Sequence, residues 1–239
     1  MTVDILAVGA HPDDVELAMA GSLLVFAAQG KSTAIVDLTR GELGSRGTPE
    51  VRAAEAAEAS KVLGLSVREN LNLPDGRVQD DPASRLALVG ALRRCRPRLV
   101  FTHHPQDAAG HPDHAACSAL VRSAVYLAGL ARVDTGQLRH RAEAVIFFNL
   151  PRSQFPSFIV DVSQVYARRR EALGAYHSQF HNPSSSEPET YLSHPRFLDS
   201  LEATHRYWGG GVGIEYGEAF WCERPLKVTD PTLHFGRGL

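Results

Sequence analysis

The sequence predicts a three-layer α/β/α fold, in which helices cover both faces of a mostly parallel sheet. Two observations predict it. Segments typical of strands and of helices alternate through the first two thirds of the 239 residues, with short connections between them. The strand-like segments are short, continuous apolar runs, as expected for strands that are buried on both faces. A chain with this pattern folds into parallel strands joined by helical crossovers.

Local signals mark the first four pairs of elements. The clearest helix is expected at 48–64, where Thr48 is a favourable N-cap, Pro49 opens the first turn and Gly64 ends the helix. The strand-like runs lie at 3–10, 31–39, 66–73 and 98–105, and the helix-like segments at 15–30, 48–64, 82–95 and 111–130.

The last third of the chain is less regular. Strands are expected at 144–150 and 157–162, helices at 163–179 and 196–210, and a loop leading into a final strand at 211–225. No internal repeat and no linker-like segment divides the sequence, so we expect one domain over residues 1–239. The order of the elements predicts a Rossmann-like architecture.

The composition is that of an ordinary globular protein, with 44% hydrophobic and 22% charged residues and a formal net charge of -2. A domain that binds nucleic acid needs a basic excess or stripe, so no nucleic-acid partner is expected. We interpret the densest basic cluster, Arg168, Arg169 and Arg170, as a solvated helix face. No apolar run approaches the roughly 20 residues that span a bilayer, so no membrane partner is expected.

The three cysteines, Cys95, Cys117 and Cys222, are far apart and form no CxxC pair. This pattern favours three buried thiols over a disulfide scaffold or a thiolate zinc site. The N-terminus starts at once with a strand-like run and has no signal-peptide pattern. We therefore predict a cytoplasmic protein.

Three polar clusters each follow a predicted strand. They are HPDD at 11–14, RGELGSRGT at 40–48 and HHPQDAAGHPDH at 103–114. Parallel sheets bind ligands beyond the carboxyl ends of their strands, so the clusters should converge at one edge. A nucleotide-phosphate cradle is not expected, because GxGxxG does not follow the first strand and GxxxxGK[ST] is missing.

Two of these clusters have the residue types and spacing of metal ligands. His11 and Asp14 lie three residues apart across a turn that Pro12 restricts, and His111 and His114 lie three apart at a helix start. Imidazoles and carboxylates suit zinc, and three protein ligands leave a fourth position open for water. Two histidines and one carboxylate would make a catalytic type of site.

The alternative interpretation is a pair of capped helix starts. Asp13 or Asp14 would cap the first helix, and His111 or Asp113 would cap the second. Each cluster alone is moderate evidence for a metal. The two together, each at the end of a predicted strand, favour the metal site.

The motifs AHPDD at 10–14 and GHPDH at 110–114 resemble those of the PIG-L/LmbE-like family of zinc-dependent N-deacetylases. The resemblance extends over nearly the whole chain. The segments TRGELGSRGT at 39–48 and EYGEAF at 215–220 are similar to the branch that deacetylates N-acetylglucosaminyl-malate in bacillithiol biosynthesis. These branch motifs are less specific for the substrate than the histidine motifs are for the family.

The resemblance implies a role for each matched position. The zinc ligands would be His11, Asp14 and His114; Asp13 would be the general base, His111 would stabilise the oxyanion, Asp113 would orient a histidine, and Arg52 would bind substrate. Zinc is the expected metal, and iron(II) is the alternative because it also accepts two histidines and a carboxylate. The resemblance also implies a homo-oligomer.

Other residues near these motifs have two interpretations each. Arg46 is a second candidate for a substrate carboxylate, because arginine binds carboxylates in a bidentate manner, or else it is a surface charge. Asp107 would bond sugar hydroxyls or cap its loop. Of His103 and His104, one would line the pocket, or they would be satisfied histidines packed against the loop.

The expected function is hydrolysis of the N-acetyl group of a GlcNAc conjugate, a small-molecule substrate, with N-acetylglucosaminyl-malate preferred. The alternatives within this chemistry are another small GlcNAc conjugate or a chitooligosaccharide. A zinc-dependent amidase that acts on a thiol conjugate would share the catalytic residues. A non-catalytic metal- or sugar-binding module is disfavoured, because a binder needs the metal ligands but not the base Asp13.

Overall fold

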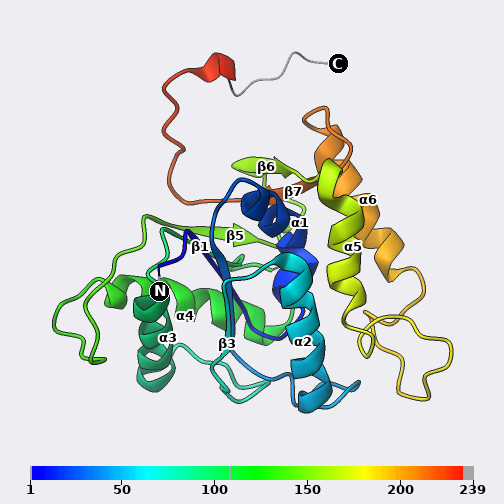
Figure 1. The fold of residues 1–239 in the computed structure, drawn as a ribbon, viewed down its shortest axis with the longest axis horizontal. Coiled ribbons are helices and arrows are strands. Elements are labelled where there is room, and N and C mark those ends of the chain that lie inside the picture. Colours follow the sequence, from blue (N-terminus) through cyan, green and yellow to red (C-terminus); the bar gives the residue numbers. More distant parts are fainter. Residues whose placement is uncertain (1, 108, 234–239) are drawn as a thin grey trace.

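Five parallel strands form the central sheet of the computed structural model, which describes residues 2–107 and 109–233 (Figure 1). Their order is β3-β2-β1-β4-β5, and each neighbouring pair is parallel. The strands are β1 (Ile5–Gly9), β2 (Thr33–Asp37), β3 (Val67–Asn70), β4 (Leu99–His103) and β5 (Ala144–Phe148). The expected three-layer fold with a mostly parallel sheet is confirmed.

Helices cover both faces of this sheet (Figure 1). Successive residues of β1 pack into the two cores in turn: Leu6 and Val8 into one, Ile5 and Ala7 into the other. A strand buried on both faces therefore appears in the sequence as an unbroken apolar run. One face carries α3 (Pro82–Cys95) and α4 (Pro112–Ala128), and the other carries α1 (Asp14–Ala28), α2 (Pro49–Leu63) and α5 (Tyr166–Gly174).

Side chains beside the helix ends explain why the helix predictions succeed. Thr48 Oγ1 accepts a hydrogen bond from the Val51 amide at 3.3 Å, and Gly64 ends α2 in the left-handed conformation, with φ 68°. Asp81 accepts from the amide of Ala83 at 2.8 Å at the start of α3. These bonds satisfy amides that the first turn of a helix leaves free. The helices expected at 48–64 and 82–95 are confirmed to within one residue.

The last third adds a small antiparallel sheet of β6 (Phe158–Asp161) and β7 (Gly217–Phe220), with α6 (Phe197–Gly210) beside it. A bridge between Phe147 and Trp221 ties this part to the edge strand β5. The helix expected at 163–179 is shorter in the structure: a 3-10 turn at Ser163–Val165 leads into α5.

Helix α1 is broken at Met19, where φ is -151°. Beyond the break, the amides of Gly21 and Ser22 donate to the carboxylate of Glu218 at 3.0 and 2.6 Å. Arg169 donates to the same carboxylate at 3.0 Å and to the carbonyl of Leu17 at 2.8 Å, so it satisfies the other side of the break. The interpretation of Arg169 as part of a solvated face is wrong, because its side chain is 1% exposed.

The cysteines follow the expectation in two cases. Cys95 and Cys117 are buried free thiols, whereas Cys222 is half-buried, so the prediction of three buried thiols is wrong for Cys222. In the described part of the chain, no helix combines the length and the apolar character needed to cross a membrane.

Candidate metal centre

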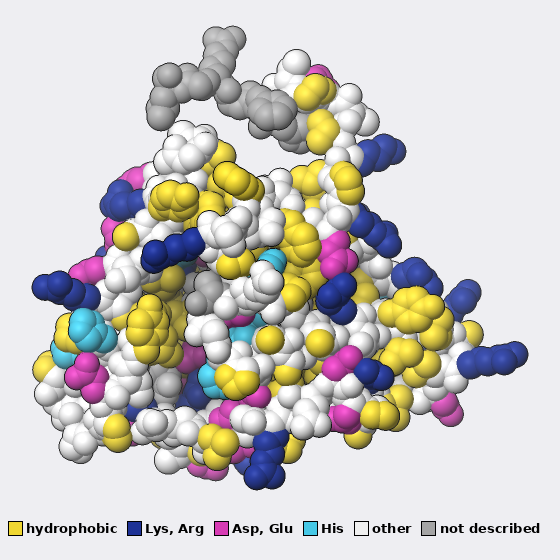
Figure 2. Space-filling view, turned by 180° about the vertical axis from the view of Figure 1, so that it is seen from behind, with side chains coloured by type: hydrophobic (Ala, Val, Ile, Leu, Met, Phe, Trp, Pro, Cys, Tyr) yellow, Lys and Arg dark blue, Asp and Glu magenta, His cyan; other side chains and the backbone are white. Residues whose placement is uncertain are grey.

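The carboxyl ends of β1 and β4 lie side by side where the strand order reverses. Ligands of open α/β sheets bind in the crevice at this point. The HPDD turn leaves β1 here, and His103 ends β4. On the face in Figure 2, histidine side chains lie in a hollow with acidic side chains close by.

The turn after β1 is held in an unusual conformation. Asp13 has a φ of 112°, a left-handed value that costs a residue with a side chain about 1–3 kcal/mol. Asp14 Oδ2 accepts from the His11 amide at 2.7 Å, and Arg52 donates to the carbonyl of Pro12. These bonds stabilise the turn and give the two adjacent carboxylates different partners.

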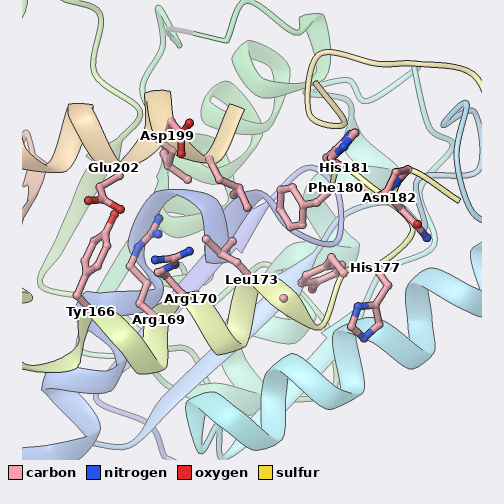
Figure 3. A pocket seen from close by; sticks show the side chains of 15 residues that line it. Tyr166, Arg169, Arg170, Leu173, His177, Phe180, His181, Asn182, Asp199 and Glu202 are labelled. Carbon is pink, nitrogen blue, oxygen red and sulfur yellow. The ribbon is translucent and has the colours of Figure 1, made fainter. Parts of the chain in front are cut away.

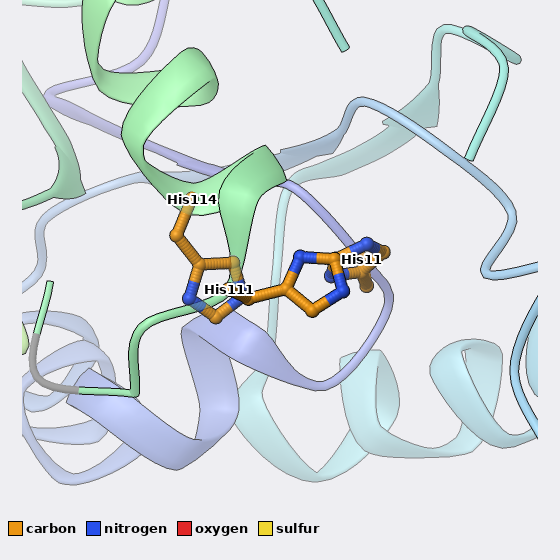
Figure 4. A group of neighbouring side chains, drawn as sticks. All are labelled: His11, His111 and His114. Atoms are coloured by element: carbon orange, nitrogen blue, oxygen red, sulfur yellow. The ribbon is translucent and has the colours of Figure 1, made fainter. Parts of the chain in front are cut away.

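The carboxylate of Asp14 is the centre of the histidine cluster. Its Oδ1 lies 3.2 Å from Nε2 of His114, and its Oδ2 lies 3.3 Å from Nδ1 of His11 and 3.2 Å from Nε2 of His103. The rings of His11 and His111 have centroids 4.7 Å apart (Figure 4). The structure thus brings together the three residues expected to bind metal and adds His103 to them.

Among the residues that the structure describes, three overlapping groups of side chains could hold a cation, and in each the donor atoms lie within 4.8 Å of one another. Imidazole nitrogens with a carboxylate oxygen are the donor set of many catalytic zinc sites. The residues present therefore fit a divalent metal of the expected kind. The groups are His11, His111 and His114; Asp14, His103 and His114; and His11, Asp75 and Asp113.

The carboxylates give this cluster a strong preference for positive charge. Burial lowers the pKa of His11, but Asp14 and Asp113 outweigh burial and raise this pKa to about 12. Burial is likewise outweighed at His114, where Asp14 raises the pKa to about 10. A site that retains protons on buried imidazoles also attracts a divalent cation, which competes with these protons for the same nitrogens.

Asp13 lies beside Arg52 rather than among the histidines. Its residue is 3% exposed, and its Oδ2 lies 3.0 Å from Nη2 of Arg52. Burial raises the pKa of Asp13 to about 7, while the charge of Arg52 opposes this shift. A general base is most effective when its pKa is close to the working pH. The Arg52 Nε atom has no hydrogen-bond partner within the described part of the chain.

His111 caps helix α4, because its Nδ1 accepts from the amide of Asp113 at 3.2 Å. A neutral ring that accepts at Nδ1 has its proton on Nε2 and can donate it. Burial, followed by the charges of His11 and His114, lowers the pKa of His111 and favours this neutral form. The capping alternative therefore applies at the second cluster, whereas at the first the side chain of Asp13 caps no amide of the described residues.

Two further carboxylates, one after β3 and one in the segment between β4 and α4, contact the histidines. Asp75 Oδ1 lies 3.0 Å from Nε2 of His11. Asp107 Oδ1 lies 3.0 Å from Nδ1 of His114, and its Oδ2 lies 3.0 Å from Nδ1 of His103. Sequence reasoning misses Asp75, because an aspartate in a PDG triplet has the pattern of an ordinary turn residue.

The two histidines at the end of β4 have different roles. His103 is fully buried and joins the cluster. His104 packs its ring against Trp221 and accepts a hydrogen bond from the amide of Gln106 at 3.0 Å. For His104, the interpretation as a satisfied histidine packed against the loop therefore applies.

Arg46 is 4% exposed, so its interpretation as a surface charge is wrong. Its Nε donates to the Ser178 carbonyl at 2.7 Å, and its Nη1 donates to the Pro188 carbonyl at 3.1 Å. Arg46 therefore ties the glycine-rich loop to the segment that follows α5.

A separate pocket of about 370 Å³ opens between α5 and α6 (Figure 3). Tyr166, Arg170 and His177 line it, together with Asp199 and Glu202. Its lining includes none of the residues grouped above as able to hold a cation. This pocket is therefore distinct from the histidine cluster.

Comparison with known proteins finds a family model that matches half of this chain. The model of the PIG-L family, described as GlcNAc-PI de-N-acetylase, matches residues 6–125. These residues include most of β1, the HPDD turn, Asp75, Asp107 and most of α4. The match therefore covers the whole histidine cluster.

Three curated relatives are deacetylases by name. The diacetylchitobiose deacetylase of Thermococcus kodakarensis is 26% identical, over 86% of this chain and 81% of its own length. A 1D-myo-inositol 2-acetamido-2-deoxy-alpha-D-glucopyranoside deacetylase 2 of Saccharopolyspora erythraea is 28% identical, over 80% and 89%. The probable N-acetyl-alpha-D-glucosaminyl L-malate deacetylase 2 of Bacillus anthracis is 28% identical, over 74% and 81%.

Among solved structures, the conserved protein TT1542 from Thermus thermophilus is similar to this chain. It is 43% identical, and the superposition covers 95% of this chain and 97% of that one with a TM-score of 0.85. The similarity therefore includes the last third of the chain, beyond the residues that the family model matches.

Proposed function

This chain belongs to the PIG-L family, and from that premise we propose that it is a metal-dependent hydrolase that removes the N-acetyl group of a GlcNAc conjugate. One observation carries the proposal: Asp14 contacts the ring nitrogens of His11 and His114, while the adjacent Asp13 is paired separately with Arg52. Metal binding and proton transfer are thereby assigned to different carboxylates of one turn.

The proposed metal ligands are His11, Asp14 and His114, with zinc as the metal and iron(II) as the alternative. When bound, zinc supplies Lewis acidity, which polarises the amide carbonyl and lowers the pKa of a neighbouring water to about 7. The side chains of the protein then provide the proton transfers and the orientation.

Asp13 is the proposed general base. It accepts a proton from the attacking water, as the new C–O bond forms at the acetyl carbon. Its burial supports this role, because it raises the pKa of Asp13 towards neutrality. The same proton can then pass to the leaving nitrogen when the C–N bond breaks, giving acetate and a free amine. A positioned base contributes about 100- to 10,000-fold to the rate.

His111 is the proposed donor to the oxyanion. Its Nδ1 is engaged by the amide of Asp113, so the neutral ring has a proton on Nε2 to donate. One preorganised donor of this kind is worth about 3 kcal/mol in the transition state. A neutral donor suffices, so this role requires no protonation of His111.

The proposed substrate is N-acetylglucosaminyl-malate, which would place the protein in bacillithiol biosynthesis. The malate relative supports this choice, and the inositol and diacetylchitobiose relatives support the wider class of GlcNAc conjugates. Malate has two carboxylates, which arginine binds well. Arg52 is our first candidate for this contact because its Nε lacks a partner among the described residues, and Arg46 is the second.

An acetate-release assay tests the proposal. The purified protein is incubated with N-acetylglucosaminyl-malate, the inositol conjugate, diacetylchitobiose and free GlcNAc, before and after chelation and after zinc is restored. We expect turnover that is lost on chelation, returns with zinc and is highest with the malate conjugate. Equal rates on free GlcNAc and on the malate conjugate would refute the substrate, and release of acetate from none of them would refute the deacetylase.

A further inference from the structure

We propose that Asp75 and Asp107 are positioning residues that fix which ring nitrogen each metal-binding histidine presents to the site. The inference rests on the metal centre of the proposed function. Neither carboxylate needs to touch the metal or the substrate for this role, since each acts on a histidine from the opposite side of its ring.

Asp75 acts on His11. The Nδ1 atom of His11 is the nitrogen near Asp14, at 3.3 Å from Oδ2, whereas its Nε2 lies 3.0 Å from Oδ1 of Asp75. A carboxylate accepts a hydrogen bond only from a protonated nitrogen, so Asp75 selects the tautomer with the proton on Nε2. In the neutral ring, which is the form that binds a metal, the lone pair is then on Nδ1, the nitrogen beside the proposed ligand Asp14.

Asp107 acts on His114 through the other ring nitrogen, Nδ1. Its Oδ1 lies 3.0 Å from Nδ1 of His114, which leaves the lone pair on Nε2, and this Nε2 lies 3.2 Å from Asp14. Asp107 Oδ2 does the same for His103, whose ring stacks on that of His114 with centroids 4.0 Å apart. Both oxygens of Asp107 are thus engaged by imidazoles, and its side chain is 2% exposed. This leaves little capacity for a sugar hydroxyl.

The two carboxylates are themselves fixed by the backbone. Asp75 Oδ2 accepts from the Leu43 amide at 2.8 Å, and Asp107 Oδ1 accepts from the Ala109 amide at 2.8 Å. Asp113 is a weaker candidate for the role at His11. Its Oδ2 lies 3.4 Å from Nε2 of His11 and accepts a shorter bond, 2.7 Å, from the amide of Gly76.

Zinc affinity of the metal-free protein tests the inference without any substrate. The variants Asp75→Asn and Asp107→Asn keep the size of each side chain and remove the charge. Asp80→Asn is the matched control, because Asp80 binds Arg85 and Ser123 but no histidine among the described residues. In competition with a chromophoric chelator, we expect zinc affinity to fall about 10- to 100-fold in the two test variants. The control should stay within about 2-fold of the wild type.

A second measurement reads the tautomers directly. Nitrogen-15 NMR of the imidazoles in the zinc-loaded protein should show a protonated Nε2 at His11 and a protonated Nδ1 at His114. Asp75→Asn should perturb the His11 signals alone, and Asp107→Asn those of His114 and His103. Wild-type zinc affinity in both variants, or the opposite tautomers in the wild type, would overturn the inference.

The acetate-release assay separates this inference from the proposed function. If the variants lose zinc affinity but the wild type releases no acetate, the positioning role stands and the deacetylase proposal fails. If the wild type releases acetate while both variants bind zinc as it does, the positioning role alone fails.

Discussion

The Nη2 atom of Arg52 lies 3.0 Å from Oδ2 of Asp13, and the same group donates to the carbonyl of Pro12. One guanidinium on α2 thus stabilises both the strained turn and the carboxylate that we propose as the base. Both side chains are almost fully buried. Each therefore depends on the other to avoid an unpaired buried charge.

Arg52→Met should leave Asp13 buried without its cation. Breaking a buried pair on one side typically costs about 3–5 kcal/mol, so the free energy of unfolding in urea should fall by that amount. Arg98→Met is the control, because the pair of Arg98 with Glu143 is exposed and such pairs are worth about 0–1 kcal/mol. An equal decrease in the free energy of unfolding of the two variants would show that the buried pair of Arg52 and Asp13 is no more important for stability than the exposed one.

Asp13→Asn should keep the metal and lose the rate. Asparagine has the same size and tolerates the left-handed conformation at this position, but it cannot accept the proton. We expect kcat to fall about 100- to 10,000-fold, with wild-type zinc content by elemental analysis. A variant with zinc and near-normal turnover would exclude Asp13 as the base.

Asp14→Asn should have the opposite effect. Asp14 contacts the ring nitrogens of His11, His103 and His114, so its loss removes the centre of the cluster. Zinc affinity should fall by more than the roughly 100-fold expected for the loss of an outer partner of a ligand. Zinc titration of the metal-free variant measures this change. Retained affinity would mean that the histidines bind the metal without this carboxylate.

Gly41→Ala should destabilise the protein more than Gly30→Ala. Both glycines have a positive φ, 66° and 75°, so alanine costs each backbone about 1–2 kcal/mol. In the described part of the chain, a Cβ at Gly30 meets nothing within 4 Å, whereas at Gly41 it would collide with the guanidinium of Arg52. The difference in unfolding free energy between the variants measures the clash, and kcat/KM should fall only in Gly41→Ala. Equal effects would show that Arg52 can move away freely.

His205 should make the protein less stable in acid. Burial, with the charge of Arg169, lowers the pKa of His205 to about 2, below its ordinary value of 6.5. Between these two pH values the unfolded chain binds a proton at His205 that the folded chain does not. The free energy of unfolding therefore has its full contribution from this group above pH 6.5 and decreases as the pH drops. The slope is about 1.4 kcal/mol per pH unit for this one group.

His205→Asn should remove this term while an amide still faces the hydroxyl of Tyr166, which lies 3.2 Å from His205 Nδ1. Urea unfolding of both proteins at pH 6.5, 5.5 and 4.5 compares the slopes. Parallel stability curves would show that His205 is protonated in the folded state.

Local signals explain which parts of the fold could be predicted. The ends of α2 depend on Thr48 and Gly64, which act within a few residues and are visible in the sequence. The pairing of β6 with β7 depends on contacts between residues about 60 positions apart, such as Phe158 and Phe220, which no local pattern indicates. The same limit explains the error at Arg169, whose partner Glu218 lies 49 positions away.

In the candidate site, too, local motifs could be predicted and contacts between distant residues could not. The histidine motifs and the HPDD turn could be found because each is a short segment. Asp75 could not be found as a partner of His11, because 64 residues separate them and the PDG triplet suggests only a turn. His103 and His104 are adjacent in sequence, and only their contacts in the fold distinguish them: His103 contacts Asp14 and Asp107, whereas the ring of His104 packs against Trp221.

The hydrogen bonds from Gly21 and Ser22 to Glu218, which stabilise the break in α1, have a consequence for folding during synthesis. Glu218 follows Gly21 by 197 residues, so the helix that begins at the HPDD turn is synthesised long before Glu218. At about 5–20 residues per second, the ribosome needs about 10–40 s to cover that distance. During this interval the amides of Gly21 and Ser22 lack their final acceptor. We therefore expect the nascent chain to acquire a stable metal centre only after the ribosome has completed β7.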